Sequence, residues 1–280
     1  IEAQNAAVEV HRKAGQEALN VWNSFASEVN EKTGQSQDAM NSALHPKKLL
    51  CFAHRGGGGK APENTMAAFA RAVRMGTDWI ELDIRAVEGE LIVFHDERLE
   101  RTTDGIGPVS GQKLSYLRSL DAGDGQKIPF LSEVLDLAAG RVGINIELKD
   151  QESLDLLSAL LPEYVGRTCW SEFLLSSFDR STLARIPRCL PQVRIGVLAE
   201  HPGPEDVDFA RSLNAFSLHP GLDSLHLPFV EACHAKGLLV IPYTVNTRRD
   251  MVRVQNMGAD GIFTDYPELV LERRVNPAAL

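Results

Sequence analysis

The chain has 280 residues, of which 44% are hydrophobic and 24% are charged, a composition typical of a soluble globular protein. Its formal charge is −9 and its isoelectric point is about 5.4, which argues against a nucleic-acid-binding surface. An acidic protein that binds an anionic substrate needs local positive charge, from cationic side chains or from a metal ion.

The cysteines and the apolar segments exclude further classes. Four cysteines, Cys51, Cys169, Cys189 and Cys233, are scattered without CxxC spacing, so neither a zinc site nor a disulfide framework is predicted. No apolar run approaches the roughly 20 residues that span a bilayer, which argues against stable membrane insertion. The chain starts at Ile1. We expect a cytoplasmic protein, with a periplasmic or secreted one as the alternative if a signal peptide has been removed.

Residues 1–47 differ from the rest of the chain because they contain no strand-like run. Their apolar residues recur at helical spacing, at Leu19, Trp22, Phe25, Ala26 and Val29. This spacing predicts an amphipathic helix, which we assign to an N-terminal helical extension over 1–47. Packing of this helix on its own domain is the common outcome, and the alternative is a role toward a membrane surface or a partner, including self-association into a homo-oligomer.

From residue 48 to 275, short apolar runs alternate with helical patterns. The strand candidates are 49–53, 79–84, 91–94, 143–148, 172–177, 193–198, 214–218, 238–243 and 260–264. The helix candidates are 64–75, 132–139, 151–161, 181–187, 205–212, 222–236, 247–256 and 267–272. Such alternation is typical of a parallel sheet, and about eight strand–helix units predict a (β/α)₈ TIM barrel.

Two details refine this α/β prediction. The glycine run Gly56–Gly59 lacks the GxGxxG spacing of a dinucleotide site, which disfavours the alternative of a doubly wound sheet. The segment 97–130 interrupts the alternation, with turn-forming sequences near 102–105 and 121–125. We expect it to form a loop-rich insertion over one end of the barrel.

Polar side chains gather at the ends of several predicted strands. They are His54, Arg55, Glu81, Asp83, His95, Glu147 and Lys149. Residues two positions apart on a strand face the same side, so Glu81 aligns with Asp83, and the same holds for the pair at 147 and 149. If all of these runs are parallel, their carboxyl ends meet at one mouth of the barrel, where barrel enzymes hold their active sites.

These residue types suit the chemistry of a phosphodiester. Three carboxylates without a nearby cysteine form a hard oxygen site that suits Mg²⁺ or Ca²⁺. Arg55 and Lys149 supply positive charge for a phosphate, and the glycine run lets backbone amides approach closely. One histidine can accept a proton from the attacking oxygen while another protonates the leaving alkoxide.

Each feature also has a purely structural interpretation. A histidine at a strand end is often only hydrogen-bonded, Glu147 and Lys149 can form a simple ion pair, and a glycine run can be a flexible loop. Structural residues, however, have no reason to converge on one barrel mouth. The convergence therefore favours a functional site.

From about residue 49 to 271, the chain resembles the glycerophosphodiester phosphodiesterase family. The matching motifs are His54-Arg55-Gly56, Pro62-Glu63-Asn64-Thr65, Glu81-Leu82-Asp83, His95-Asp96, Glu147-Leu148-Lys149, Thr244-Val245-Asn246 and Gly258-Ala259-Asp260-Gly261-Ile262-Phe263-Thr264-Asp265. The resemblance implies a TIM barrel over 48–275 in which His54 and His95 form an acid/base pair.

The same resemblance implies that Glu81, Asp83 and Glu147 hold one divalent cation, while Arg55 and Lys149 contact the phosphate. Tyr243 stands where the family usually has tryptophan. An aromatic, substrate-binding wall remains there, with a changed shape and polarity. Phe178 and His219 also follow predicted strands, and we consider both as residues that line the pocket.

The activity implied is metal-dependent hydrolysis of a small-molecule glycerophosphodiester to sn-glycerol 3-phosphate and an alcohol. One alternative is a lysophospholipase D-like enzyme on the same barrel, whose substrates keep an acyl chain. Another is a non-catalytic phosphate-binding protein, which would have lost a histidine or a metal carboxylate. All of these residues are present in the chain.

Overall fold

The computed structural model describes residues 20, 24 and 48–275 of the chain. The amphipathic helix predicted within 1–47, and the self-association predicted through it, lie outside the described residues apart from Asn20 and Ser24.

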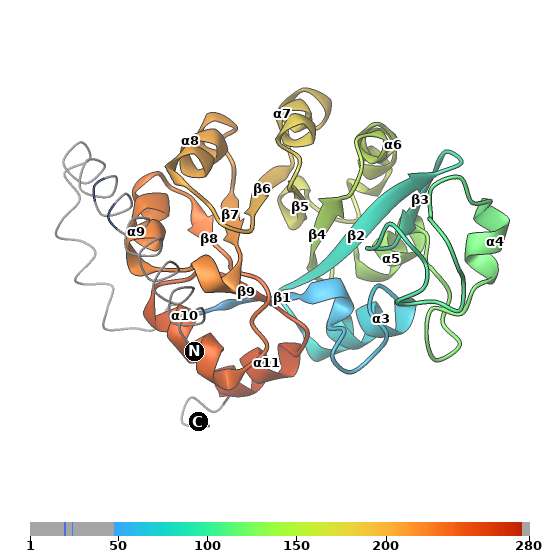
Figure 1. The fold of residues 1–280 in the computed structure, drawn as a ribbon, viewed down its shortest axis with the longest axis horizontal. Coiled ribbons are helices and arrows are strands. Elements are labelled where there is room, and N and C mark those ends of the chain that lie inside the picture. Colours follow the sequence, from blue (N-terminus) through green and yellow to red (C-terminus); the bar gives the residue numbers. More distant parts are fainter. Residues whose placement is uncertain (1–19, 21–23, 25–47, 276–280) are drawn as a thin grey trace, which may run out of the picture.

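A barrel of eight parallel strands forms the centre of the fold and confirms the predicted architecture (Figure 1). The strands are β1 (Leu50–Ala53), β2 (Trp79–Val87), β4 (Gly143–Leu148), β5 (Phe173–Ser177), β6 (Arg194–Ala199), β7 (Ser217–Pro220), β8 (Leu239–Val240) and β9 (Gly261–Thr264). They pair in the order β8-β7-β6-β5-β4-β2-β1-β9. Backbone hydrogen bonds from Asp260 N to Val240 O (2.9 Å) and from Phe263 N to Pro242 O (3.0 Å) then join the two ends of this order.

Helices surround the barrel on its outer side (Figure 1). They are α3 (Met66–Met75), α5 (Leu131–Ala138), α6 (Glu152–Leu160), α7 (Arg180–Cys189), α8 (Pro204–Ser212), α9 (Leu227–Ala235), α10 (Arg248–Asn256) and α11 (Pro267–Val275). The helix predicted over 222–236 is wrong in its first part. A short 3₁₀ turn (Leu222–Ser224) precedes α9, because Pro228 has no amide hydrogen with which to continue a helix backwards.

The run predicted at 91–94 is not a parallel strand of the barrel. It is β3 (Glu90–Val93), which pairs antiparallel with the far end of β2, in register from Ile84 opposite Val93 to Val87 opposite Glu90. The two-residue turn explains the reversal, since Glu88 and Gly89 both have positive φ angles, of 49° and 81°. Two such residues are typical of the tight turn of a β-hairpin.

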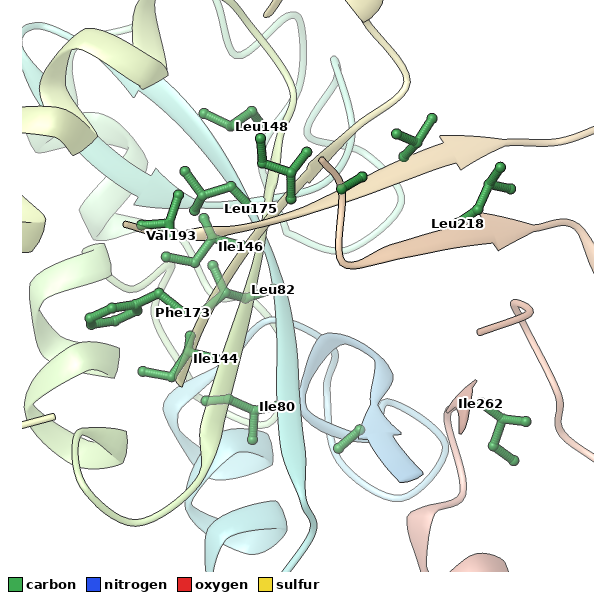
Figure 2. Packing of buried hydrophobic residues seen from close by; sticks show 14 of the residues in the cluster. Ile80, Leu82, Ile144, Ile146, Leu148, Phe173, Leu175, Val193, Leu218 and Ile262 are labelled. Carbon is green, nitrogen blue, oxygen red and sulfur yellow. The ribbon is translucent and has the colours of Figure 1, made fainter. Parts of the chain in front are cut away.

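Successive side chains of each barrel strand point alternately toward the surrounding helices and into the barrel interior. On β2, Ile80, Leu82 and Ile84 are fully buried in the core between strands and helices. Figure 2 shows the first two gathered with Ile144 and Ile146 of β4. The residues between them on β2 consequently face into the barrel.

The insertion over 97–130 has a small hydrophobic core of its own. Leu99, Val109, Leu117 and Ile128 pack there with Ile92 of β3, and each is at most 1% exposed. Most of the segment is loop, as predicted, but it also contains α4 (Leu114–Ser119), which was not predicted. In Figure 1 the insertion lies at one side of the barrel, beside β3 and α5. This core gives the insertion a fixed attachment to the mouth.

Candidate active site

Three carboxylates meet at the carboxyl ends of β2 and β4. One oxygen from each of Glu81, Asp83 and Glu147 can be chosen so that all lie within 4.8 Å of one another. Strand register brings them together, because Asp83 pairs directly with Glu147 across the two strands. The sequence correctly predicted that they share a direction.

The electrostatics of this cluster suit a cation. Burial and the neighbouring Asp83 carboxylate raise the pKa of Glu81 to about 8, and the same two causes raise the pKa of Glu147. Oε1 of Glu81 is buried and has no hydrogen-bond partner among the described residues. A buried carboxylate oxygen without a partner is costly, and a hard divalent cation among these oxygens would satisfy it and offset the repulsion. The donor set therefore fits Mg²⁺ or Ca²⁺.

Lys149 and Arg55 border the carboxylates. Nζ of Lys149 lies 3.0 Å from Oδ1 of Asp83 and also pairs closely with Glu147, so the ion pair considered from the sequence exists. The backbone amide of Arg55 donates to Oε2 of Glu81 (2.7 Å), and its Nε lies 3.5 Å from Oδ2 of Asp83. Burial alone would raise the pKa of Asp83, but the two cations outweigh it and lower that pKa. Positive charge therefore lies beside the cluster, where an anionic substrate needs it.

The two histidines have matching environments. Nδ1 of His54 is 2.7 Å from Oδ1 of Asp265, and Nδ1 of His95 is 2.6 Å from Oδ1 of Asp96. Because a carboxylate only accepts hydrogen bonds, we assign the proton to Nδ1 in each ring. That tautomer leaves each Nε2 free for chemistry, and both rings line the same pocket.

Their pKa values shift in opposite directions. Burial alone would lower the pKa of His54, but the hydrogen bond with Asp265 and the charge of Glu81 outweigh it and raise that pKa. Burial lowers the pKa of His95, with Lys149 and Arg55 adding to the effect against the opposing charge of Asp83. The site therefore holds two imidazoles with different proton affinities.

His95 reaches the mouth by a different route from the one predicted. The prediction placed it at the carboxyl end of a parallel barrel strand, but it follows the antiparallel strand β3 of a hairpin. The hairpin instead returns the chain to the level of Asp83, where the amide of Phe94 donates to the Asp83 carbonyl (2.9 Å). The residue is therefore in the predicted place, although the strand before it runs in the opposite direction.

The glycine run is closely packed. The amides of Gly57 and Gly58 donate to the carbonyl of His54, and the amide of Gly59 donates to the carbonyl of Asp265 (3.0 Å). A side chain at Gly56 would clash with Ala68, since a Cβ there would lie 2.8 Å from the Cβ of Ala68. These three amides are bonded to backbone carbonyls of the protein and are therefore not available to a ligand. The glycines are needed for close packing of the loop, and not for the predicted approach of backbone amides to a ligand.

Aromatic side chains form the opposite wall of a pocket of about 280 Å³. The hydroxyl of Tyr243 donates to Oε2 of Glu200 (2.8 Å), and its ring meets Phe178 edge-on at 6.0 Å. Phe178 lines the pocket, as considered from the sequence. His219 does not: it is fully buried below the pocket, against Phe263, with its Nε2 2.7 Å from the Ser217 hydroxyl.

Several site residues were missed by the sequence reasoning. Asp265 and Asp96 belong to quoted motifs but had no assigned role, although Asp265 directly follows Thr264 at the end of β9 and Asp96 directly follows His95. Asn145 lies two residues before Glu147, hence on the same face of β4, and is 1% exposed in the pocket wall. Glu200 gave no signal, because its relation to Tyr243 spans 43 residues.

Within the described part of the chain, no helix is long and apolar enough to cross a membrane.

Comparison with known proteins agrees with this geometry. Residues 54–269 match the model of the glycerophosphoryl diester phosphodiesterase family. A glycerophosphodiester phosphodiesterase of Caldanaerobacter subterraneus subsp. tengcongensis is 36% identical over 238 residues, covering 80% of this chain and 97% of that protein. One from Bacillus subtilis is 31% identical over 264 residues, covering 85% of this chain and 90% of that protein.

Solved structures show the same fold. A phosphodiesterase from Oleispira antarctica, determined in complex with the product sn-glycerol 3-phosphate, superposes with a TM-score of 0.74 at 28% identity, covering 81% of this chain and 97% of that one. The family match spans most of the chain, including every motif at the barrel mouth. The chain belongs to the glycerophosphoryl diester phosphodiesterase family, a family of phosphoric diester hydrolases.

Proposed function

We propose that this protein hydrolyses glycerophosphodiesters to sn-glycerol 3-phosphate and an alcohol, with the help of one divalent cation and of two histidines. The observation that carries the proposal is the convergence of His54, His95 and the carboxylate cluster on one pocket. The similar structure from Oleispira antarctica, whose product is sn-glycerol 3-phosphate, supports the choice of substrate class.

Glu81, Asp83 and Glu147 are the residues that would hold the cation. When bound, Mg²⁺ or Ca²⁺ supplies positive charge that stabilises charge developing on phosphate oxygens. Arg55 and Lys149 orient the phosphate from the same side, since their side chains already lie beside the carboxylates. Binding of the anion therefore does not depend on the overall charge of the protein, which is negative.

His54 and His95 divide the proton transfers between them. One Nε2 accepts the proton of the attacking oxygen, and the other Nε2 donates a proton to the departing alkoxide. The opposite pKa shifts of the two rings support a pair that starts in different protonation states. Asp265 and Asp96 accept from Nδ1 of the two rings, which leaves each Nε2 available to accept or to donate a proton.

The pocket supports a small substrate. Its volume of about 280 Å³ is at the low end for small-molecule sites, and its walls are mostly polar on the side of the phosphate. Tyr243, Phe178 and Glu200 form the remaining wall, which we assign to the alcohol part of the substrate. The small volume of the pocket and the Glu200 carboxylate in this wall favour a small polar alcohol over an acyl chain, so the lysophospholipase D-like alternative is not adopted.

The test is a substrate panel in metal-free protein reconstituted with Mg²⁺, Ca²⁺ or Mn²⁺. EDTA should abolish turnover, and Mg²⁺ or Ca²⁺ should restore it. Release of sn-glycerol 3-phosphate from glycerophosphocholine, measured with a coupled dehydrogenase, identifies the activity, and lysophosphatidylcholine tests the alternative. Full activity without metal would refute the cation site, and turnover of the lysolipid alone would refute the substrate class.

We further propose that residues 1–47 are an extension that takes no part in the chemistry. The family match begins at residue 54, and no motif residue precedes it. A chain that starts near Pro46 should keep kcat, while size-exclusion chromatography reports whether self-association is lost. Loss of turnover in a truncated protein that still melts cooperatively would contradict this assignment.

A further inference from the structure

Arg101, at the start of the insertion, joins two carboxylates at the rim of the site. Its Nε and Nη2 donate to Oδ2 and Oδ1 of Asp96 at 2.6 and 2.8 Å. Its Nη1 and Nη2 donate to Oε2 and Oε1 of Glu63 at 2.8 and 2.7 Å. The guanidinium is therefore bidentate toward both partners, the strongest geometry available to an arginine.

Each of these carboxylates holds a residue of the proposed machinery. Oδ1 of Asp96 is also the partner of His95 Nδ1, at 2.6 Å. Oε1 of Glu63 also accepts from Nη1 of Arg55, at 2.7 Å. Arg101 thus lies one carboxylate away from a proposed acid/base histidine and one carboxylate away from a proposed phosphate ligand.

The charges show what Arg101 stabilises. Without it, the negative charges of Asp96 and Glu63 would repel one another at the rim, and each carboxylate would be held by its site partner alone. The hydrogen bonds from Arg101 hold the pKa of Asp96 well below its usual range. The partner of the other histidine is held differently, because Asp265 accepts from the neutral amide of Asn246 (2.6 Å). Among the described residues, the carboxylate that holds His95 is thus bound by a cation from the insertion, whereas the carboxylate that holds His54 is bound by a neutral amide.

The insertion holds the backbone of Arg101 in place. Leu99, two residues earlier, is fully buried in the hydrophobic core of the insertion. The hydroxyl of Thr103, two residues later, donates to the carbonyl of Leu99 (2.7 Å) and closes a turn around Arg101. The side chain itself is 47% exposed, so its position comes from its two carboxylate partners and from this turn.

We propose that Arg101 is a positioning residue that holds His95 and Arg55 in register with the site, so that the insertion is required for turnover. This inference rests on the proposed function for its kinetic consequences. We call the four hydrogen bonds from Arg101 to Asp96 and Glu63 the clamp. Its loss should affect both the proton transfer and the binding of the phosphate. The arm through Asp96 orients the histidine and should affect kcat, while the arm through Glu63 orients the phosphate ligand and should affect KM.

The experiment compares Arg101→Gln and Arg101→Lys with Arg98→Gln as a matched control. Arg98 lies in the same segment and pairs, among the described residues, with Glu100 (2.6 Å), and neither residue lines the pocket, so its variant should stay within twofold of wild type. Arg101→Gln should lower kcat/KM about 10- to 100-fold, the usual size of effects from groups that orient a site residue. Arg101→Lys should recover only part of the lost kcat/KM, because a single ammonium group cannot bind two carboxylates bidentately.

Partner variants separate the two arms. Asp96→Asn should lower kcat with little change in KM, and Glu63→Gln should mainly raise KM. Arg101→Gln combined with Asp96→Asn should have the same kcat as Asp96→Asn alone, because the two act as one unit. Fully multiplicative effects in the double variant would overturn the proposal, as would kcat and KM within twofold of wild type in a folded Arg101→Gln protein.

A readout without substrate distinguishes this proposal from the proposed function. The hydrogen-bonded Nδ1 proton of His95 should give a downfield NMR resonance, identified by its loss in His95→Gln. Arg101→Gln should shift or broaden this resonance, whereas Arg98→Gln should not. If wild type hydrolyses no glycerophosphodiester, the proposed function fails and this resonance alone decides the clamp. An unchanged resonance in Arg101→Gln would overturn it.

Discussion

The interior of the barrel has two halves that are built from the same strands. In the lower half, Phe52, Trp79 and Phe263 stack on one another, with ring centroids 5.3 Å apart for the first two and 4.8 Å apart for Phe52 and Phe263. Two residues further along these three strands, the side chains are His54, Glu81 and Asp265. The lower half is a packed aromatic layer, and the upper half is a set of charges at the mouth.

The difference shows how the fold supports an energetically costly site. The rings of Phe52 and Phe263 in the lower half bury large apolar surfaces and carry no polar atom. The upper half contains Oε1 of Glu81 and Oδ1 of Asn145, which are buried without a hydrogen-bond partner among the described residues. The lower layer therefore stabilises the barrel, while the mouth is organised for binding. Changes in the two halves should have opposite consequences for activity and for stability.

The largest expected effect concerns the histidines of the mouth. Replacing His54 or His95 by Asn should lower kcat by about 10²–10⁴-fold, because each removes one proton transfer. The melting temperature should change little. A substrate with a p-nitrophenolate leaving group should largely rescue the variant that lacks the acid, since this group departs without a proton. Near-normal turnover of the natural substrate by both folded variants would refute the two-histidine mechanism.

The matching change in the lower half should act on stability instead. Phe52→Ala removes a fully buried ring and should lower the free energy of unfolding by about 3–5 kcal/mol. At a temperature where the variant is still folded, its kcat should stay within a fewfold of wild type. Chemical denaturation and initial rates on the same preparations test both statements. A large loss of kcat with unchanged stability would show that the two halves are not separable.

His219 lies at the boundary and predicts a pH dependence. Burial lowers its pKa to about 3, against 6.5 for an exposed histidine. The unfolded chain therefore binds a proton below pH 6.5 that the folded chain does not. Stability from this residue is fully present above pH 6.5 and is lost as the pH falls toward 3, by about 1.4 kcal/mol per pH unit.

Urea unfolding between pH 7.5 and pH 5 measures this contribution. Below pH 6.5, the slope of the free energy of unfolding against pH should be smaller than in wild type by about 1.4 kcal/mol per pH unit, which corresponds to one proton. This should hold in both His219→Gln and His219→Leu, whatever their stability at pH 7.5. Two neutral replacements of different packing separate titration from packing. A slope equal to that of wild type in both variants would be inconsistent with a neutral, buried imidazole.

The smallest expected effect is at Glu81 in metal-free protein. Its raised pKa means that the folded chain keeps a proton that the unfolded chain loses above pH 4.5, so its cost to stability grows as the pH rises from 4.5 toward 8. Glu81→Gln should therefore raise the melting temperature at pH 8 by about 2–4 °C, and by less at pH 5. Calorimetric titration with Mg²⁺ or Ca²⁺ should show weakened binding in the same variant. A melting temperature that falls equally at both pH values would contradict the cost assigned to this charge.

Much of the site could be predicted because its residues lie at strand ends. The alternation of apolar runs and helical patterns predicted the barrel, and spacing of two residues predicted that Glu81 and Asp83 share a direction. The antiparallel hairpin was missed because the run 91–94 has the same apolar composition as a parallel strand. The Glu88-Gly89 turn was the available signal, since two residues with positive φ reverse a strand.

The partners of the site residues could not be predicted in the same way. Asp265 is 211 residues from His54, and Arg101 is 38 residues from Glu63, so no local period relates them. The role of the glycine run likewise depends on residues distant in the sequence, because a Cβ at Gly59 would lie 2.4 Å from the ring of Tyr266. Close approach of this kind is invisible to composition.

By itself, the sequence determined the residue types and their order along each strand, and these follow from the two-residue period of extended backbone. It therefore determined which carboxylates and imidazoles face inward. Only the tertiary structure decided how the strands are registered across the barrel, and hence that Asp83 lies opposite Glu147. Register depends on closure of the barrel and on packing of the helices around it, which are properties of the whole chain. The tautomers of the histidines and the link from the insertion to the mouth follow from that closure.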